Sequence, residues 1–437
     1  MNYHETLKYL YAALPVFHRI GPAAYKNDLG NTIALMQALN HPERAFPSIH
    51  IAGTNGKGSV SSMLSAIFTH AGYKTGLYTS PHLQSFTERI RINGKGIPEE
   101  EVASWVGGIK PLIESIQPSF FEITVAMCFD YFRKEGVEIA IIETGLGGRL
   151  DSTNVVQPEL SIITNISFDH MDLLGDTLEK IASEKAGIIK PGVPCVIGTD
   201  HPGVLPVFQA KAAEVASPLF QVSDLWLPMD GTCAWPISTW NWQNKETKHH
   251  LTVQTDLSGQ YQQENIGTVL AACSVLNDIG FPIAEETICQ ALSKVTTLSG
   301  LKGRMQKLRD HPFVLTDVGH NEGGIQQVIS QILSLDFDAL HIVLGMVSDK
   351  DRQKILTLLP THAHYYFVQP DLPRALPAHQ LKNEALAFGL QGNTYISIAA
   401  GIKAALAAAD PKDLVFIGGS TFVVAEALDF FDATQNT

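Results

Sequence analysis

The chain has 437 residues, of which 45% are hydrophobic and 17% are charged, and its formal net charge is −13. This is the composition of a globular protein with two or three domains, and it contains no apolar run of about 18 residues, the length that spans a membrane. The acidic balance argues against a nucleic-acid binder, which normally carries a basic surface, but it does not exclude a local site for an anion.

The cysteines and the N-terminal residues indicate the compartment. No two cysteines are spaced as C-x-x-C, so the sequence predicts no zinc or redox motif and five reduced thiols, at Cys128, Cys195, Cys233, Cys273 and Cys289. The first residues lack the basic start and apolar run of a signal peptide. We therefore expect a cytoplasmic protein without membrane or nucleic-acid partners.

Short apolar stretches alternate with helical patterns in the first half of the chain. Strands are predicted at Ser48–Ala52, Gly76–Thr79, Ile139–Glu143, Leu160–Asn165 and Pro194–Gly198. Helical patterns lie between them, such as Val60–Ala71, Thr124–Lys134 and Thr177–Gly187. This alternation is typical of an α/β fold with a mostly parallel sheet. Ligands of such sheets bind beyond the carboxyl ends of the strands.

The segment 219–259 has a different pattern. Its residues alternate in polarity, as in His250–Asp256, and it contains Trp226, Trp235, Trp240 and Trp242. We predict a small antiparallel flank in which the tryptophans pack rather than bind a ligand. A helix from about Gln263 to Ile279 is predicted to follow.

A break near residues 296–302 precedes a second alternation of strands and helices. We place the domain boundary there, giving a first domain at 1–297 and a smaller, Rossmann-like α/β domain at 298–437. Its strands are predicted at Phe313–Asp317, His341–Gly345, His364–Val368, Tyr395–Ile398 and Leu414–Gly418.

A glycine-rich loop between a predicted strand and a predicted helix indicates ATP binding. Backbone N–H groups at a helix N-terminus attract phosphate oxygens, and Lys57 adds a full positive charge. Yet only two residues separate Gly53 from Gly56, and Gly58 stands where the standard loop has a magnesium-binding hydroxyl. A plain strand-to-helix turn is the alternative. The predicted nucleotide-binding residues are Gly53, Thr54, Asn55, Gly56, Lys57, Gly58 and Ser59.

With its glycine at position 58, the segment Gly53–Ser59 resembles the loop of the folylpolyglutamate synthases and dihydrofolate synthases. These enzymes belong with the Mur ligases. Six further segments resemble motifs of that family in the same order. They are Tyr78–Leu83, Glu143–Asp151, Asp169-His170, Ser183–Gly187, Gly303-Arg304 and Asp317–Asn321. The resemblance covers nearly the whole chain. It implies an ATP-binding, Mur-ligase-like domain at 1–297 and a glutamate-ligase domain at 298–437.

The resemblance also implies two magnesium sites. Ser80 and Glu143 are assigned to the first, and His170 and Lys185 to the second, where Lys185 carries a carbamate derived from carbon dioxide. The residues leave alternatives open. Ser80 fits a simple Ser-Pro turn, Glu143 fits an ion pair with Arg149, and Lys185 fits an ordinary lysine that pairs with a phosphate or with Glu184.

Substrate contacts are carried over in the same way. The resemblance places dihydropteroate on three segments, with Phe121 stacking on the heterocycle and Asp28 or Asp151 accepting hydrogen bonds from it. From sequence alone, a core role for Phe120 and Phe121 is a close alternative. Asn31-Thr32 departs from the family pattern. The segments are Asp28-Leu29-Gly30, Ser119-Phe120-Phe121-Glu122 and Leu150-Asp151-Ser152.

Residues near and beyond the boundary are expected to close on the nucleotide and on glutamate. The resemblance assigns Asn265, Arg304 and Asp317 to the nucleotide. It assigns His320 and Ser420 to the incoming glutamate, although the residues around His320 depart from the family pattern. The catalytic residues are predicted to be Lys57, Lys185 and His320.

The predicted reaction is an ATP-dependent amide ligation. The carboxylate of dihydropteroate or of a folate tail forms an acyl phosphate, which the amine of L-glutamate attacks, giving ADP and phosphate. We expect a monomer that acts on both substrates. The rival predictions are a Mur-type cell-wall ligase, for whose extra N-terminal domain the roughly 50 residues before the loop are too few, and a regulatory nucleotide-binding module without ligase activity.

Overall fold

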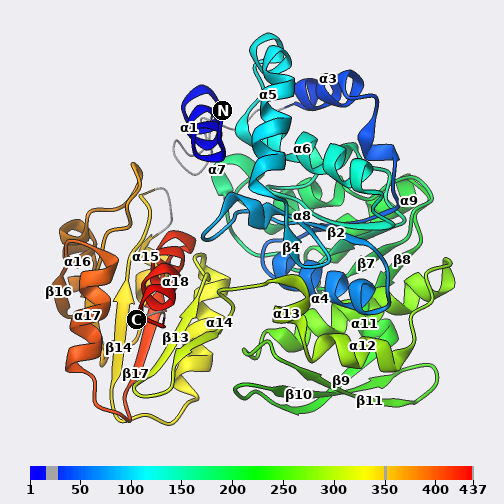
Figure 1. The fold of residues 1–437 in the computed structure, drawn as a ribbon. Coiled ribbons are helices and arrows are strands. Elements are labelled where there is room, and N and C mark those ends of the chain that lie inside the picture. Colours follow the sequence, from blue (N-terminus) through cyan, green and yellow to red (C-terminus); the bar gives the residue numbers. More distant parts are fainter. Residues whose placement is uncertain (16–27, 349–351, 436–437) are drawn as a thin grey trace. The chain divides into compact units, whose positions relative to one another are not determined.

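The computed structural model describes residues 1–15, 28–348 and 352–435, which form two compact units (Figure 1). The first unit comprises Met1–Cys233, Ile237–Asp256 and Gln262–Leu301. The second comprises Ala234–Pro236, Leu257–Tyr261 and Lys302–Thr437. Two short pieces of the second unit therefore come from within the stretch of chain that builds the first.

The first unit is built on an eight-stranded sheet with the order β4-β3-β2-β5-β1-β6-β7-β8. Six strands are parallel, and β3 and β4 are antiparallel additions at one edge. The predicted mostly parallel sheet is confirmed. The strands are β1 (Ser48–Ala52), β2 (Thr75–Tyr78), β3 (Ile90–Ile92), β4 (Lys95–Gly96), β5 (Ile139–Glu143), β6 (Leu160–Ile163), β7 (Cys195–Ile197) and β8 (Leu219–Gln221).

Helices cover both faces of this sheet, so the central strands β1, β5 and β6 are buried along their whole length. In Figure 1, α4 and α11 lie on one face and α5 and α6 on the other. The helices of the first unit are α1 (Tyr3–Ala13), α3 (Gly30–Ala38), η2 (Pro42–Arg44), α4 (Lys57–His70), η3 (Phe86–Arg89), α5 (Glu99–Ile116), α6 (Phe120–Glu135), η4 (Ser152–Val155), α7 (Met171–Leu174), α8 (Leu178–Ala186), α9 (Leu205–Glu214), α10 (Val222–Leu225), α11 (Gln262–Asp278), α12 (Glu285–Leu292) and α13 (Val295–Ser299).

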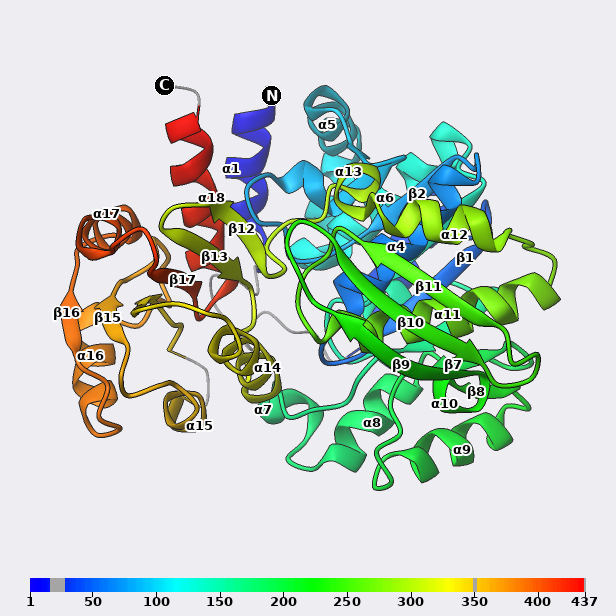
Figure 2. The same cartoon turned by 90° about the horizontal axis from the view of Figure 1, so that it is seen from below.

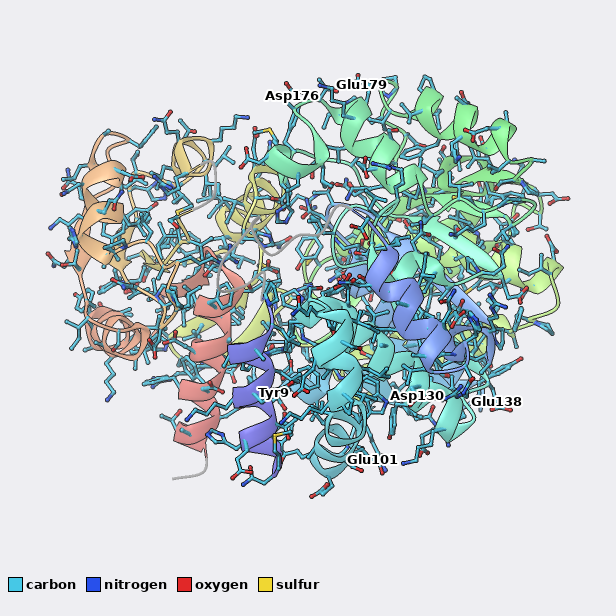
Figure 3. The ribbon with its side chains drawn as sticks, turned by 90° about the horizontal axis from the view of Figure 1, so that it is seen from above. Tyr9, Glu101, Asp130, Glu138, Asp176 and Glu179 are labelled. Atoms are coloured by element: carbon cyan, nitrogen blue, oxygen red, sulfur yellow. The ribbon has the colours of Figure 1, made fainter. Side chains whose placement is uncertain are left out.

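The N-terminus of α8 shows how local sequence starts a helix. The side chain of Thr177 accepts a hydrogen bond from the backbone N–H of Lys180 at 3.3 Å, as an N-cap residue does. Asp176 and Glu179 place negative charge at the same end, where it complements the helix dipole (Figure 3). The hydrogen bond from Lys180 lowers the pKa of Asp176. The helix is therefore fixed at its first turn, eight residues before Lys185.

A separate three-stranded antiparallel sheet confirms the predicted flank (Figure 2). It consists of β9 (Trp226–Thr232), β10 (Ser238–Asn244) and β11 (His250–Thr255). Trp226, Trp240 and Trp242 are buried, in agreement with a packing role. The prediction was wrong for Leu219–Gln221, which pairs in parallel with β7 and so extends the large sheet. This segment has three residues, too few to distinguish the two pairings by periodicity.

The second unit has a six-stranded sheet with the order β12-β13-β17-β14-β15-β16. All its pairs are parallel except β12 with β13. The prediction of a strand at Tyr395–Ile398 was wrong, because Ser397 caps a helix that starts at Ile398. The strands and helices are β12 (Gln306–Arg309), β13 (Phe313–Asp317), α14 (Glu322–Leu333), β14 (Leu340–Leu344), α15 (Arg352–Thr357), β15 (His364–Phe367), α16 (Ala378–Leu386), β16 (Gly392–Thr394), α17 (Ile398–Ala408), β17 (Leu414–Gly418) and α18 (Thr421–Gln435).

Over the described ranges, every helix is too short or too polar to cross a lipid bilayer.

Candidate functional site

The predicted phosphate loop connects β1 to α4 and is shaped by two glycines. Gly53 has φ +154°, and a Cβ there would lie 2.0 Å from Thr164 Oγ1. Gly56 has φ +86°, and a Cβ there would lie 2.4 Å from Asn265 Oδ1. Larger residues are excluded at both positions. The backbone can therefore turn directly from the end of a buried strand into the N-terminus of α4, which begins at Lys57.

Residues that follow β6 hold this loop in place. The N–H of Thr54 donates to the carbonyl of Asn165 at 2.7 Å, and its hydroxyl donates to the carbonyl of Ser167 at 3.1 Å. The hydroxyl of Thr164 donates to the carbonyl of Asn55 at 2.6 Å. Sequence reasoning did not identify Thr164 or Ser167. Their hydroxyls at a strand end were the available signal.

Two ammonium groups converge on one carbonyl oxygen of the loop. Lys57 Nζ donates to the carbonyls of Gly53 at 2.9 Å and Thr54 at 3.2 Å. Lys185 Nζ, from α8, also donates to the carbonyl of Gly53 at 2.9 Å. Among the described residues, no carboxylate forms an ion pair with either ammonium. Lys57, together with the protonated form of Lys185, therefore places positive charge at the loop without an ion-paired carboxylate.

The environment of Lys185 changes its protonation. Its side chain is only 3% exposed, and burial, followed by the charge of Lys57, lowers the pKa of Lys185 to about 7. A large share of this lysine is therefore a neutral amine near pH 7. Its single hydrogen bond goes to the Gly53 carbonyl, so the alternative in which Lys185 pairs with Glu184 is wrong.

Close packing brings Lys185 to the loop. The glycine-rich segment after β5 lies directly on α8, because a Cβ on Gly148 would lie 2.8 Å from the carbonyl oxygen of Glu184. A Cβ on Gly187 would lie 2.4 Å from the Cα of Arg149. Arg149 Nη2 also pairs with Glu184 Oε1 at 2.9 Å. The two segments are thus locked together on either side of Lys185.

Ser80 and Glu143 meet at the ends of adjacent strands. The backbone N–H of Ser80 donates to Glu143 Oε2 at 3.2 Å. Glu143 is the last residue of β5 and is 4% exposed. The next hydroxyl, Thr144 Oγ1, is buried without a hydrogen-bond partner. A hydroxyl and a carboxylate here are oxygen donors of the kind that magnesium prefers.

The residues predicted for a second metal are His170, which adjoins Asp169, and Lys185, whose pKa is lowered by burial but raised in part by the charge of Asp169. His170 has φ +51° and precedes α7, and its ring Nε2 lies 3.8 Å from Asp169 Oδ1. Its backbone N–H donates to the same carboxylate at 2.9 Å. Within residues 1–15, 28–348 and 352–435, no three His, Cys, Asp or Glu side chains converge on a metal-sized site. The unmodified ammonium of Lys185 cannot ligate a cation.

The segment predicted to hold the pterin ring divides into structural and accessible residues. Ser119 and Glu122 form a capping box at the start of α6, with the N–H of Glu122 donating to Ser119 Oγ at 3.2 Å. Phe120 is 2% exposed and packs in the core. Phe121 is partly exposed and lies against Gly145, where a Cβ would approach its ring to 2.4 Å. Phe121 alone of this group offers a partly exposed ring beside the glycine-rich segment.

Asp151 is fully engaged within its own loop. Oδ2 accepts hydrogen bonds from the N–H groups of Gly145 and Leu146, both at 2.8 Å. Oδ1 accepts from the N–H of Thr153 at 3.0 Å and from its hydroxyl at 2.5 Å. Burial raises the pKa of Asp151, whereas these hydrogen bonds lower it. The carboxylate of Asp151 therefore fixes the shape of the glycine-rich segment. Of its two neighbours in the sequence, Leu150 is half-buried and Ser152 is buried.

The other predicted contacts of the first unit lie at helix starts. Asp28 Oδ1 accepts a hydrogen bond from the N–H of Gly30 at 2.7 Å, just before α3. Leu29 is half-buried. Asn265, in the first turn of α11, donates to Gln262 Oε1 at 2.8 Å. Gln262 in turn donates to Ser59 Oγ at 3.4 Å, so α11 and the phosphate-loop helix are joined at their first turns.

In the second unit, Asp317 organises the ends of the strands. Its Oδ2 accepts hydrogen bonds from the hydroxyl of Tyr261 at 2.6 Å and from the N–H of Met305 at 2.7 Å. Its Oδ1 accepts from the N–H of Gly319 at 2.7 Å. Arg304, next to Met305, is half-buried and donates to the carbonyl of Gly303 at 3.4 Å. Sequence reasoning did not identify Tyr261.

His320 and Ser420 lie beyond neighbouring strands of this unit. Asp317 at the end of β13 pairs in register with Gly418 at the end of β17. His320 Nδ1 lies 2.9 Å from the carbonyl of Val318, and Ser420 Oγ accepts from the N–H of Val423 at 3.3 Å. Both residues therefore occupy the carboxyl edge of the sheet, where ligands of open α/β sheets bind.

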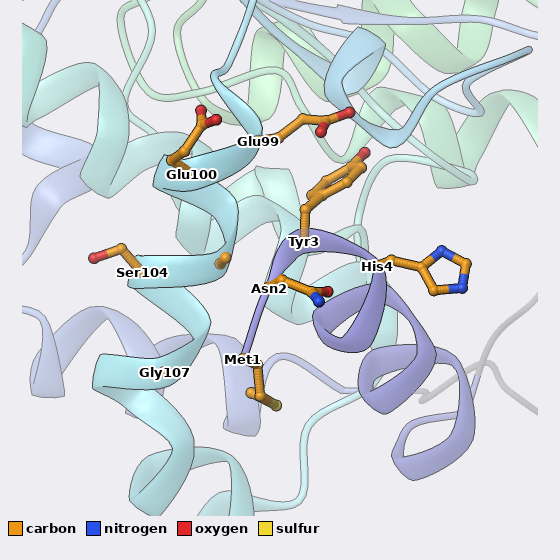
Figure 4. A pocket seen from close by; sticks show the side chains of 9 residues that line it. Met1, Asn2, Tyr3, His4, Glu99, Glu100, Ser104 and Gly107 are labelled. Atoms are coloured by element: carbon orange, nitrogen blue, oxygen red, sulfur yellow. The ribbon is translucent and has the colours of Figure 1, made fainter.

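A surface cavity of about 750 Å³ lies between α1 and α5 (Figure 4). It includes none of the predicted site residues. Its lining residues are Met1, Asn2, Tyr3, His4, Glu99, Glu100, Ala103, Ser104 and Gly107.

Comparison with known proteins points to one family for both units. Residues 51–273 match the Mur ligase middle domain, and residues 303–421 match the Mur ligase glutamate ligase domain. The chain is 36% identical to the dihydrofolate synthase/folylpolyglutamate synthase of Bacillus subtilis, over 82% of this chain and 84% of the relative.

Two solved structures have the same fold. E. coli FolC in complex with DHPP and ADP has a TM-score of 0.85 and 29% identity, covering 100% of this chain and 99% of the other. A bifunctional folylpolyglutamate synthase/dihydrofolate synthase with Mn, AMPPNP and L-glutamate bound has a TM-score of 0.84 and 27% identity, covering 100% and 98%.

Proposed function

The chain belongs to the dihydrofolate synthase and folylpolyglutamate synthase family of ATP-dependent Mur-type ligases, and from this premise we propose how its residues divide the work. The enzyme is an ATP-dependent ligase that adds L-glutamate in folate metabolism. We propose that it accepts both dihydropteroate and the glutamate tails of folates. The partly exposed Phe121 ring beside Gly145 supports a flat heterocycle as substrate.

Lys57 and the N-terminus of α4 form the phosphate site of this proposal. The substrate carboxylate oxygen attacks the γ-phosphorus of ATP, the bond to the β-phosphate oxygen breaks, and ADP leaves with an acyl phosphate formed. The amine of glutamate then attacks the acyl carbon, loses a proton, and phosphate leaves. The observation that carries this assignment is the pair of ammonium groups on the Gly53 carbonyl without a carboxylate partner. Phosphoryl transfer depends mainly on positioning and on such charge neutralisation.

Ser80 and Glu143 fit a magnesium ion. They supply a hydroxyl and a carboxylate at the ends of adjacent strands, where the backbone N–H of Ser80 donates to Glu143 Oε2 at 3.2 Å. The next residue, Thr144, has a buried hydroxyl without a hydrogen-bond partner. When bound, magnesium neutralises phosphate oxygens and orients them. We assign the second metal to His170 and Lys185, with Asp169 holding the position of His170.

Lys185 fits the second metal only after carbamylation. Its neutral amine adds to carbon dioxide, a C–N bond forms, and the displaced proton passes to solvent, which leaves an anionic carbamate with two oxygens. The lowered pKa supports this step, because the neutral amine is the nucleophile. The new charge also offsets the repulsion between Lys57 and Lys185.

The second unit contributes residues at the carboxyl edge of its sheet. We propose that Arg304 binds phosphate through its planar guanidinium and that Asp317 contacts the nucleotide, as Asn265 of the first unit does. Asp317 holds three hydrogen bonds within its unit, so its proposed contact uses the remaining acceptor capacity. His320 and Ser420 are assigned to glutamate. We further propose a monomeric enzyme of the cytoplasm, a reducing compartment that suits five free cysteines.

Product analysis tests the proposed substrates. Purified enzyme is supplied with ATP, magnesium and L-glutamate, together with either dihydropteroate or tetrahydrofolate, and ADP and glutamate conjugates are measured. We expect glutamate-dependent ADP release with both. Conjugation of only one substrate would contradict the bifunctional assignment, and ADP release independent of glutamate would contradict the ligase mechanism.

A further inference from the structure

Arg89 is a buried cation that the proposed reaction does not use. It lies at the end of η3, directly before β3, and its side chain is only 1% exposed. Burial lowers the pKa of Arg89. A buried guanidinium is costly unless its donors are satisfied. The contacts of this guanidinium therefore indicate its structural role.

These contacts lead to the loop that carries Ser80. Arg89 Nε donates to His82 Nδ1 at 2.7 Å, and the guanidinium carbon lies 5.3 Å from the centre of the Phe120 ring. The backbone carbonyl of Arg89 also accepts a hydrogen bond from the N–H of Thr79 at 3.1 Å. The two residues on either side of Ser80-Pro81 are thus both held by Arg89.

The neighbouring residue fixes the rest of the same loop. Glu88 Oε2 accepts a hydrogen bond from the N–H of Leu83 at 2.7 Å. Glu88 Oε1 accepts from the N–H groups of Gln84 and Ser85, both at 3.1 Å. Three consecutive amides are therefore satisfied by one carboxylate. Residues 79–85 return to β3 with their backbone fixed at both ends.

We propose that Arg89 is a positioning residue for the magnesium site, acting through His82 on the placement of Ser80. The inference rests on the proposed role of Ser80 as a magnesium ligand. His82 accepts the hydrogen bond through Nδ1, which fixes the orientation of its ring. The guanidinium carbon also lies over the Phe120 ring, and the Arg89 side chain is hydrogen-bonded to Tyr78. Ser80 is then held where its N–H reaches Glu143 Oε2 at 3.2 Å.

This chain offers a matched control for the test. Arg91 lies two residues further along, on β3, and its side chain is also buried, at 9% exposure. Its Nε lies beside Gly300, 3.3 Å from where a Cβ on that glycine would be. Arg91→Met therefore removes a buried guanidinium of the same segment without removing the contact with His82.

The experiment compares Ser80→Ala, Arg89→Met, His82→Phe and Arg91→Met with the unmodified enzyme. Mn²⁺ binding in the presence of a non-hydrolysable ATP analogue is measured by electron paramagnetic resonance, and thermal melting is recorded in parallel. Loss of a group that supports a metal ligand typically weakens metal binding by about 10- to 100-fold. We expect about tenfold weaker binding for Ser80→Ala, Arg89→Met and His82→Phe, and unchanged binding for Arg91→Met. His82→Phe keeps the test valid if Arg89→Met does not fold.

Hydrogen exchange of the metal-free protein gives a second readout. We expect Arg89→Met to speed exchange of the amides of Ser80 and His82, which the Glu88 carboxylate does not hold, and Arg91→Met to leave them unchanged. If Ser80→Ala binds Mn²⁺ normally, the proposed metal role of Ser80 is wrong. If Ser80→Ala weakens binding but Arg89→Met and His82→Phe do not, the positioning role of Arg89 is wrong and the proposed function stands.

Discussion

The two units have similar strand-end loops with opposite electrostatic character. In the first unit, Lys57 and Lys185 direct two ammonium groups at the Gly53 carbonyl, with no carboxylate in an ion pair to either among the described residues. In the second unit, the carboxylate of Asp317 accepts three hydrogen bonds from Tyr261, Met305 and Gly319. The loop of the first unit has cationic side chains without an ion-pair partner, whereas the loop of the second unit has a carboxylate whose hydrogen bonds are made within the unit.

This difference distinguishes side chains placed to bind a ligand, such as Lys57, from side chains that stabilise the fold, such as Asp317. When Lys57 and Lys185 are both protonated, their repulsion destabilises the free protein, and an anionic ligand offsets this repulsion. A carboxylate with three good donors stabilises its own loop. We therefore expect substitutions in the first loop to act on catalysis, and substitutions at Asp317 to act mainly on stability.

Lys57→Ala is expected to have the largest effect. Loss of a charge that stabilises the transferring phosphate should lower the rate of ADP formation by about 10³-fold. The melting temperature should not fall, because the substitution relieves repulsion with Lys185. Lys190→Ala is the matched control, since Lys190 also donates to a backbone carbonyl, that of Asn154 at 2.8 Å. ADP formation at the normal rate in Lys57→Ala would show that the loop does not bind phosphate.

Removal of carbon dioxide should have the next largest effect. The pKa of Lys185 is lowered to about 7, so the amine is mostly neutral above that pH and mostly protonated below it. The carbamate should therefore form above pH 7 and be lost below it. Bicarbonate-depleted enzyme should lose activity about 10- to 100-fold and recover when bicarbonate is added at pH 8. Intact mass measurement must then show the added carbamate, and active enzyme without it would exclude the modification.

Asp317→Asn tests the other side of the comparison. The amide loses the negative charge and cannot accept all three hydrogen bonds, which should reduce the free energy of unfolding by about 2 kcal/mol. Chemical denaturation measures this change. If stability is unchanged and only the KM for ATP rises, Asp317 acts through its proposed nucleotide contact alone, and the contrast between the loops is wrong.

Tyr261→Phe should have the smallest effect. It removes one of the three donors to Asp317, the hydroxyl at 2.6 Å, while the ring remains. We expect a loss of about 1 kcal/mol in the free energy of unfolding. The double variant with Asp317→Asn should lose less unfolding free energy than the sum of the losses in the two single variants, because both substitutions remove the same hydrogen bond. Full additivity would show that the pair does not interact.

Strands with strong apolar patterns were predictable from sequence. The observed bounds of β1, β5, β13 and β17 are those predicted. Buried parallel strands are apolar throughout and end at polar or glycine residues. The short segments Leu219–Gln221 and Tyr395–Ile398 were assigned wrongly, because three or four residues carry too little periodicity.

The site was predictable as a set of motifs but not as contacts. The bond from Lys185 to Gly53 joins residues 132 positions apart, and it depends on how Gly148 and Gly187 let two segments approach. Nor does sequence distinguish the buried Phe120 from its partly exposed neighbour Phe121. Glu88 and Arg89 offer one further signal in the sequence, a charged pair directly before Ile90.

The interleaving of the two units in the chain has a consequence for protein engineering. Residues 234–236 and 257–261 belong to the second unit although the first unit continues until Leu301. Trp235 Nε1 donates to the carbonyl of Met305 at 2.9 Å, and the N–H of Gln260 donates to Gln331 Oε1 at 3.1 Å. A fragment that starts at Lys302 lacks these partners. Chimeric ligases with exchanged C-terminal units should therefore take these two segments from the same parent as residues 302–437.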